Sequence, residues 1–359
     1  MRLRTIKMLE IGDSVKLNGV LTYDFKPRDY SGDDTDICHM DINAITQISS
    51  LYSSNQVHNS DKYFQIDIDW SSLVDAVIKS YDPESEYYGI IDGKKRKILD
   101  VVRTGNNKFD SWGRLKLNIT LYLSDINDEY EAVLALKKLL MDIFFVSNIS
   151  MPGVFDLYNS ELSIGNDENK FKFKLSSFYF SQSLNSIIDG PIPLSITLVP
   201  ATVKCWFDGL NITAKLESEH SIERAIFSLL HICHLDADVS MVSWVFHALE
   251  ALYGTKSGRG FNDIASKAIF LLDIPVSKQK RFKADLRKLN DLRSSFIHGG
   301  YKVNHPLNDE YDEAIFPLLE FGTLIIINSI QALVQRKWIE LSVQEVFIGV
   351  PQTYSIQAR

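Results

Sequence analysis

The residues best suited to chemistry lie near position 295. The segment Leu289-Asn290-Asp291-Leu292-Arg293-Ser294-Ser295-Phe296-Ile297-His298-Gly299-Gly300 places Arg293 five positions before His298. Arginine carries a permanent planar cation that can hold a phosphate group. Histidine can both accept and donate a proton near neutral pH. Together the two side chains could cleave a phosphodiester of RNA without a metal ion.

This spacing is not specific by itself. An arginine followed by a histidine after four to six residues is expected about once by chance in a chain of this size. Arg224 and His231 form a second such pair, and because they are seven positions apart they share one face of a helix. We interpret that second pair as the edge of an amphipathic helix. For Arg293 and His298, the structural alternative is an arginine in a salt bridge at a helix end, followed by a capping histidine.

A basic stretch surrounds the first pair, although the chain is acidic overall with a formal net charge of -8. A nucleic-acid site on such a chain must be a local patch, and this stretch could concentrate a polyanion. The alternative is a solvated helix face. Tyr301 could stack on a base or simply pack against the protein. We expect the RNA-binding residues to be Lys280, Arg281, Arg287, Lys288, Tyr301 and Lys302.

Two segments carry a resemblance to a known family. Residues 244–254 read WVFHALEALYG and residues 292–299 read LRSSFIHG. This pairing resembles the HEPN superfamily, in particular the ApeA-like HEPN domains, in which an ALEALY-type helix precedes an RS-x-x-x-HG segment. The resemblance covers about residues 216–345 and does not extend to the N-terminal part.

The resemblance implies a metal-independent endoribonuclease. In such enzymes the ribose 2′-OH attacks the adjacent phosphate and leaves a 2′,3′-cyclic phosphate and a 5′-OH. On this chain His298 would be the general base or acid, and Arg293 would hold the scissile phosphate. Ser294 would orient the arginine, unless it is a plain surface serine. Glu250 would orient Arg293 or His298 from the neighbouring helix, unless it is a structural ion-pair partner.

The spacing also constrains how the two groups can meet. Residues five apart on a regular helix point about 140° away from each other, so Arg293 and His298 would not share a face. Either the helix ends or distorts between them, which Gly299-Gly300 permits, or the two groups act across a subunit interface. HEPN domains commonly dimerise with two motifs facing one cleft. The resemblance therefore implies a homodimer.

The resemblance also implies a biological role. ApeA-like proteins are associated with defence against phage, so we expect a regulated anti-phage or toxin effector. The N-terminal part would then sense a trigger or a regulatory partner, or restrain the nuclease. The rival hypothesis is a catalytically silent HEPN module that binds RNA or a protein partner.

Residues 1–215 predict an α+β domain of unknown ligand, with a sensor or regulatory role. Its expected helix, Asp128 to Phe145, starts with acidic residues that suit the positive end of a helix dipole. Strands are expected where apolar and polar residues alternate or where β-forming residues gather. These runs are Tyr63 to Trp70, Leu115 to Leu123, Lys170 to Phe180 and Ser195 to Phe207.

Residues 216–345 predict an all-α helical bundle, because the apolar spacing becomes helical and the connections are short. Gly254 and Gly299-Gly300 are stop signals, and Pro317 interrupts or begins the last helix. Residues 346–359 form a C-terminal tail. The expected helices are Ser221 to Leu235, Val239 to Tyr253, Phe261 to Leu272, Ser277 to Ile297 and Asp309 to Trp338.

Several function classes are disfavoured. Cys38, Cys205 and Cys233 are far apart, which argues against a disulfide framework and points to a reducing cytoplasm. His231 and His234 lie three apart but lack companions for a metal site, so no metal or cofactor is expected. The N-terminus does not resemble a signal peptide, and no apolar run of about 18 residues predicts a membrane span. No P-loop, dinucleotide fingerprint or nucleophile elbow is visible.

Overall fold

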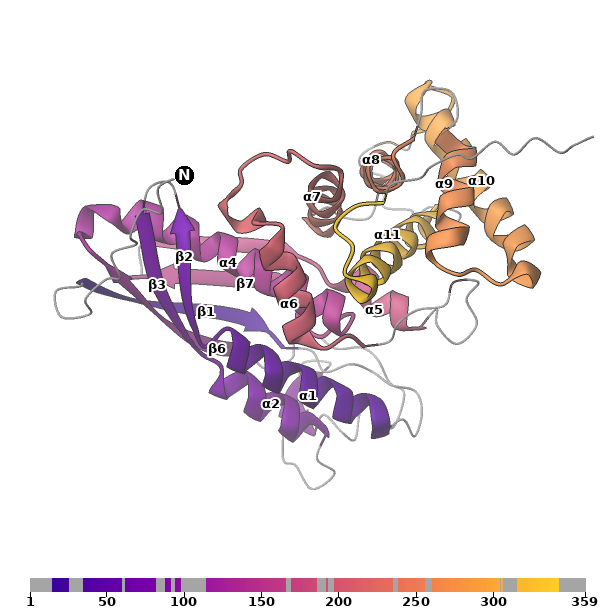
Figure 1. Cartoon of the computed structure of the whole chain (residues 1–359). Coiled ribbons are helices and arrows are strands. Elements are labelled where there is room, and N and C mark those ends of the chain that lie inside the picture. Colours follow the sequence, from indigo (N-terminus) through magenta and orange to yellow (C-terminus); the bar gives the residue numbers. More distant parts are fainter. Residues whose placement is uncertain are drawn as a thin grey trace, which may run out of the picture.

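The computed structural model describes residues 15–25, 35–59, 62–81, 88–91, 94–97, 114–165, 169–185, 192, 197–234, 238–255, 260–303, 305 and 315–341. A six-stranded antiparallel sheet with helices lies on one side of the molecule, and helices α7 to α11 gather on the other (Figure 1). The predicted α+β class is confirmed: a β-rich part is followed by a mostly helical part.

The strand order of the sheet is β2-β3-β6-β1-β7-β8. On β6, Leu117, Ile119 and Leu121 are buried, whereas Lys116 and Asn118, which alternate with them, are exposed. One face of the sheet therefore packs against the core and the other faces water. A separate hairpin pairs β4 with β5. The strands are β1 Val15–Asp24, β2 Ser54–Asn59, β3 Lys62–Asp69, β4 Tyr88–Ile91, β5 Lys94–Lys97, β6 Arg114–Leu123, β7 Leu157–Ile164 and β8 Asn169–Leu175.

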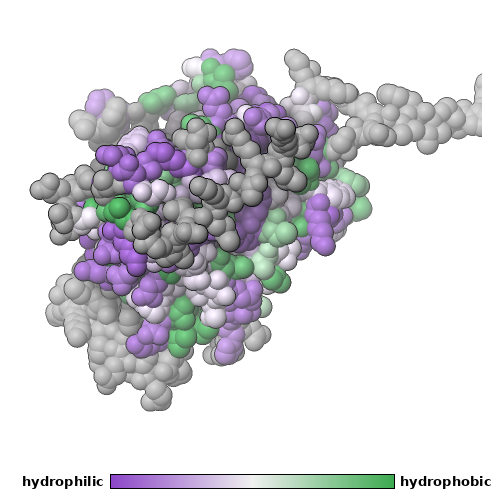
Figure 2. All heavy atoms as spheres, turned by 60° about the vertical axis from the view of Figure 1, so that its left-hand side comes forward, coloured by the Kyte–Doolittle hydropathy of each residue, from purple (hydrophilic) through white to green (hydrophobic). Residues whose placement is uncertain are grey.

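Helix α4 packs against β2, β3 and β6 and is buried along most of its length. Helices α1 and α2 contact each other, and α1 also packs on α4 and α6. With the sheet side of the molecule turned forward, the surface formed by the described residues shows hydrophilic side chains with separate hydrophobic areas among them (Figure 2). The helical elements of this part are α1 Thr35–Leu51, α2 Ser71–Tyr81, η2 Ile126–Asp128, α4 Glu129–Ser150, α5 Phe178–Asn185, α6 Pro200–Gly209 and η3 Ile212–Ala214.

Two of the four strand predictions are confirmed, as β3 and β6, and two need correction. The run Lys170 to Phe180 is a strand only as far as Leu175, because Ser176 Oγ accepts a hydrogen bond from the Phe178 amide (3.2 Å) where α5 begins. The run Ser195 to Phe207 was wrong as a β segment, because α6 begins at Pro200. A proline in the first turn and buried residues at helical spacing outweigh the β-branched composition.

The five predicted C-terminal helices are confirmed with small changes at their ends. Gly254 adopts the left-handed conformation that ends α8 (φ 52), and Pro317 lies in the first turn of the last helix rather than inside it. The expected start at Asp309 lies outside the described residues. The helices are α7 Ser221–His234, α8 Met241–Tyr253, α9 Gly260–Leu271, α10 Val276–Ile297 and α11 Phe316–Arg336.

Helix α11 joins the two parts of the molecule. It packs against α8 and α10, and also against α4 and α5. Gln331 Nε2 donates a hydrogen bond to the carbonyl oxygen of Ile149 at 2.9 Å. By length and composition α11 could cross a membrane, but most of it is buried inside the protein, so packing accounts for its apolar character. A continuous hydrophobic core runs from the sheet to α11, across the predicted boundary at residue 215. The predicted tail, residues 346–359, lies outside the described part.

Candidate functional site

Arg293 lies on the inward-facing side of α10. Phe282, Leu286 and Leu289 are the buried residues of this helix, and their spacing of four and three positions continues to Arg293. Helical periodicity therefore places the arginine where an apolar side chain would be expected. Because of this position, its guanidinium faces α8 instead of open solvent.

Two residues of α8 hold the guanidinium. Arg293 Nη2 lies 3.0 Å from Glu250 Oε1, and both side chains are 34% exposed. The guanidinium carbon lies 5.0 Å from the ring centroid of Phe246, which precedes Glu250 by one helical turn. Arg293 Nε is buried and has no hydrogen-bond partner among the residues described. The cation is thus fixed in orientation, compensated by one carboxylate and still accessible to a ligand.

His298 lies where α10 ends. Its amide donates to the carbonyl oxygen of Ser294 at 3.0 Å, and Gly299 turns the chain with φ 74. The His298 side chain is exposed. The helix is regular from Arg293 to Ile297, so the two side chains leave the axis in different directions. The predicted helix end is confirmed, because α10 ends at Ile297 and His298 is its C-cap, but the helix is unbroken over residues 294–297.

The two supporting residues differ in placement. Glu250 forms an ion pair with Arg293, which fits both the predicted orienting role and the alternative of a structural ion-pair partner. Ser294 is exposed on α10 and takes part through its carbonyl oxygen; its hydroxyl makes no hydrogen bond within the described part of the chain. The structure therefore offers Ser294 no contact through which it would orient the arginine within one chain.

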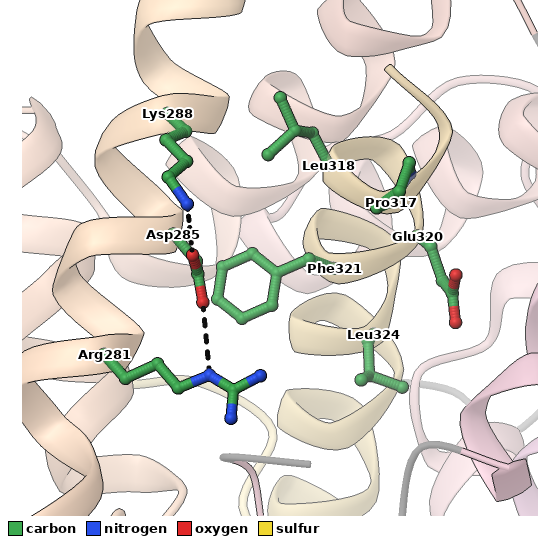
Figure 3. Close-up of a pocket in the computed structure, with 8 residues that line it drawn as sticks. All are labelled: Arg281, Asp285, Lys288, Pro317, Leu318, Glu320, Phe321 and Leu324. Carbon is green, nitrogen blue, oxygen red and sulfur yellow. Dashed lines mark hydrogen bonds and ion pairs between the residues drawn. The ribbon is translucent and has the colours of Figure 1, made fainter. Parts of the chain in front are cut away.

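The predicted RNA-binding residues do not form one patch. Arg281 and Lys288 both pair with Asp285, at 3.8 and 3.1 Å, on the side of α10 that faces α11 (Figure 3). They line a groove of about 460 Å³ together with Glu320 and the apolar residues Pro317, Leu318, Phe321 and Leu324. Its two basic side chains are balanced by Asp285 and Glu320. This groove therefore has no net positive charge to attract RNA.

The remaining predicted RNA-binding residues do not line this groove. Two lie on α10, and the other two follow its C-terminal end. The Arg287 guanidinium covers the ring of Phe261 on α9 at 4.7 Å. Lys280 and Lys302 are exposed. Tyr301 is half-buried, with its ring 6.3 Å from that of Phe296, so packing occupies part of its surface. By helical spacing Lys280, Arg287 and His298 lie near one side of α10, whereas Arg281 and Lys288 lie on the side that faces α11.

Both members of the second Arg–His pair make contacts within the protein. The ring of His231 stacks on Trp244 with centroids 4.0 Å apart, and burial lowers the pKa of His231. Arg224 donates to the carbonyl oxygen of Glu219 at 3.2 Å. Burial also lowers the pKa of His234. Over the described ranges no three histidine, cysteine, aspartate or glutamate residues gather as a metal site.

Sequence reasoning missed Asp142, a buried carboxyl inside α4. Burial raises the pKa of Asp142 from its usual value of 3.8 to about 7, and nearby Asp208 contributes in the same direction. The sequence signal was present, since Asp142 interrupts an apolar helical run, LLMDIFF. A charged residue within such a run indicates either a partner or a site.

No family model, curated protein or solved structure matches this chain. The roles of residues at this site therefore rest on their geometry and on the resemblance of the two sequence segments.

Proposed function

We propose that the protein is a metal-independent endoribonuclease of the HEPN type. The observation that carries this proposal is the position of the Arg293 guanidinium. Glu250 and Phe246 of α8 hold it in an accessible orientation, and the helix that bears Arg293, α10, ends at the exposed His298. In this proposal α7 to α11 form the HEPN-like bundle. Helix α8 supplies the orienting carboxylate and α10 supplies the two reacting groups.

In the proposed reaction the imidazole of His298 removes the proton of the ribose 2′-OH. The 2′ oxygen then attacks the adjacent phosphorus, and the bond from phosphorus to the 5′ oxygen breaks. Arg293 offsets the negative charge that develops on the non-bridging oxygens. A protonated histidine gives its proton to the leaving 5′ oxygen, and the products are a 2′,3′-cyclic phosphate and a 5′-OH.

A second copy of the chain would complete the site. Arg293 faces α8 while His298 lies at the exposed end of α10, so one chain does not direct both side chains from one helix face. We propose a homodimer in which the motifs of two copies face one cleft. One His298 would then act as the base while the other acts as the acid.

The test uses purified full-length protein and labelled RNA in EDTA. We expect cleavage that persists without metal ions and leaves cyclic-phosphate ends. His298→Ala and Arg293→Ala should each abolish cleavage, whereas His247→Ala, which removes an exposed histidine of α8, should not. Cleavage that disappears in EDTA, or that survives in His298→Ala, would contradict the proposal.

Mixing the two inactive variants tests the dimer. If groups from both copies form one cleft, co-refolded His298→Ala and Arg293→Ala chains should regain part of the activity, because a mixed dimer brings one intact Arg293 and one intact His298 into the cleft, and the single histidine can serve in turn as base and acid. A monomeric protein by sedimentation, combined with no recovery, would argue against the shared cleft.

The alternative is a catalytically silent HEPN module that binds RNA or a protein partner. The Glu250–Arg293 ion pair favours it, because a guanidinium already compensated by a carboxylate can be purely structural. In that case the protein would bind RNA without cutting it, and His298→Ala would change neither binding nor cleavage.

The cellular part of the proposal is a regulated effector in the cytoplasm. An unrestrained ribonuclease would be toxic, so the sheet-containing part would restrain it or respond to a phage trigger. We expect expression of the chain with His298→Ala to be tolerated under every condition that makes the unchanged protein toxic.

A further inference from the structure

A second pocket lies in the sheet-containing part of the molecule. It has a volume of about 340 Å³ and opens between β2, α4 and α6, which Figure 1 shows next to one another. Its polar lining includes Tyr52, His58, Asp142, Lys204 and Asp208. Pockets of this size and mixed character are typical of small-molecule sites.

Asp142 is the unusual member of this lining. Its side chain is buried, with the residue 9% exposed, and Oδ2 accepts a hydrogen bond from Thr213 Oγ1 at 2.5 Å. Within the described part of the chain, Oδ1 accepts no hydrogen bond and no basic group lies at salt-bridge distance. A buried carboxylate without a cationic partner is costly, so the carboxyl must be protonated or meet a cation from outside.

The neighbouring basic side chains are already engaged. Lys204 Nζ lies 2.6 Å from Asp208 Oδ2 and 5.3 Å from the ring centroid of Tyr52. Lys138 on α4 donates to Asn59 Oδ1 at 2.8 Å. On β2, the His58 ring packs against Tyr63 with centroids 4.7 Å apart. These groups leave the Asp142 carboxyl as the uncompensated acid of the pocket.

The charges of the pocket act on one another. Burial followed by the field of Asp208 raises the pKa of Asp142, while Lys204 and Lys138 oppose the rise. Burial, Asp142 and Asp208 in turn raise the pKa of Tyr52, so its hydroxyl stays protonated. A bound cation would favour the ionised carboxylate and release the proton that Asp142 otherwise holds near neutral pH.

The remaining wall of the pocket is apolar. Leu51, Val57 and Leu139 contribute to its lining. A bare metal ion would leave this hydrocarbon surface unused and would require several more oxygen ligands around it. A cation with a hydrocarbon part can contact the polar lining with its charged group and the apolar lining with its hydrocarbon.

We propose that this pocket binds a small organic cation, an alkylammonium or guanidinium compound, whose charged group meets Asp142 Oδ1. Its hydrocarbon part lies along the leucine and valine side chains. Thr213 positions the carboxylate by holding the other oxygen. This site is separate from Arg293 and His298 and does not depend on the ribonuclease proposal.

The test is calorimetric titration of the full-length protein near pH 7 with agmatine, which carries both an ammonium and a guanidinium group. 1-Butanol and butyrate serve as uncharged and anionic probes. We expect agmatine alone to bind, with proton release detected by comparing two buffers of different ionisation enthalpy. Asp142→Asn keeps the shape and the acceptor for Thr213, and should weaken binding at least about tenfold and abolish the proton release.

Two further variants make the result decisive. Asp75→Asn removes an exposed carboxylate of α2 and should leave binding unchanged. Asp208→Asn, at the more exposed edge of the pocket, should weaken binding less than Asp142→Asn. Equal binding by the unchanged protein and Asp142→Asn, equal binding of butanol, or a response to Mg²⁺ or Ca²⁺ but not to agmatine would overturn the proposal.

Discussion

Arg293 occupies a position on α10 that the apolar stripe of the helix would give to a hydrophobic side chain. Its aliphatic stem can pack against neighbours while the guanidinium reaches Glu250 and the ring of Phe246. An arginine in such a position is held more firmly than one on an open helix face. This restraint is what a phosphate-binding group requires, and a purely structural ion pair would look the same.

The substitution Glu250→Gln distinguishes a structural ion pair from a carboxylate that positions Arg293 for catalysis. The ion pair is about one-third exposed, so we expect its loss to change the free energy of unfolding by less than about 1 kcal/mol. If Glu250 positions Arg293 for catalysis, kcat/KM for RNA cleavage should still fall by about tenfold or more, which corresponds to about 1.4 kcal/mol. Urea denaturation and initial-rate kinetics provide the two measurements.

Asp273→Asn is the matched control, because it removes the carboxylate from the ion pair with Arg336 (2.7 Å). It should leave the cleavage rate unchanged. An equal loss of activity in both variants would show that Glu250 has no specific positioning role.

Asp142 should make the protein less stable as the pH rises, whereas a salt-bridged aspartate makes a protein more stable as the pH rises. Its pKa is raised to about 7 in the folded protein, so the native state keeps a proton that the unfolded chain releases. Stability should therefore decline as pH rises from about 4 to about 7. In Asp142→Asn this contribution is absent, and the variant should be more stable at pH 8 by about 2 to 4 kcal/mol.

Urea denaturation of both proteins at a series of pH values tests this expectation. The difference in unfolding free energy should grow between pH 4 and pH 7 and then become constant. A difference that is independent of pH would mean that Asp142 is ionised in the folded protein throughout.

Among the elements, α11 determines how closely α8 and α10 approach each other. A Cβ atom added to Gly322 would lie 2.5 Å from Val245 Cγ1 and 2.8 Å from Leu289 Cδ2. Only glycine fits between the three helices at this spacing. Because α8 carries Glu250 and α10 carries Arg293, this close packing also fixes the separation of the two elements of the candidate site.

Gly322→Ala should destabilise the protein by about 1 to 3 kcal/mol, although alanine favours helix formation, because the methyl group overpacks the contact. Thermal unfolding followed by circular dichroism measures the effect. Gly209→Ala is the control: this glycine ends α6 and has open space around it, so its replacement should be neutral or slightly stabilising. Similar effects at the two positions would contradict the close-packing argument.

The helices and strands were predictable from the sequence where neighbouring residues show regular apolar spacing and clear end signals. Helices α7 to α10 have apolar residues at helical spacing and clear end signals, so their bounds were predictable within a few residues. Helix α6 was missed because its valines and aromatic residues resemble those of a strand. Its burial against α4 and α1, which the sequence does not display, favours the helix.

At the scale of the whole molecule, the sheet-containing part and the helical part share a core. Trp206 Nε1 donates to the carbonyl oxygen of Trp338 at 2.7 Å, and the amide of Ser176 donates to the carbonyl oxygen of Cys233 at 2.9 Å. Together with the contact between Gln331 and Ile149, these bonds join segments on both sides of residue 215. We expect the two parts to unfold together.

The full-length chain should therefore show one cooperative transition, with coincident curves for tryptophan fluorescence and far-ultraviolet circular dichroism. A fragment of residues 216–345 would expose the side of α11 that packs on α4 and α5, and should aggregate or remain partly unfolded. Two separate transitions, or a soluble and cooperatively folded fragment, would show that the boundary at residue 215 divides independent domains.

The sequence alone determined the helices of the second part, two strands of the sheet and the Arg293–His298 spacing, because periodicity and end signals are properties of neighbouring residues. Tertiary structure decided that Arg293 meets Glu250, that Arg281 and Lys288 lie apart from Arg287, and that Asp142 lines a pocket. Each of these outcomes depends on which elements pack together. Local pattern does not encode that choice, because the contacting residues are brought together only when the core forms.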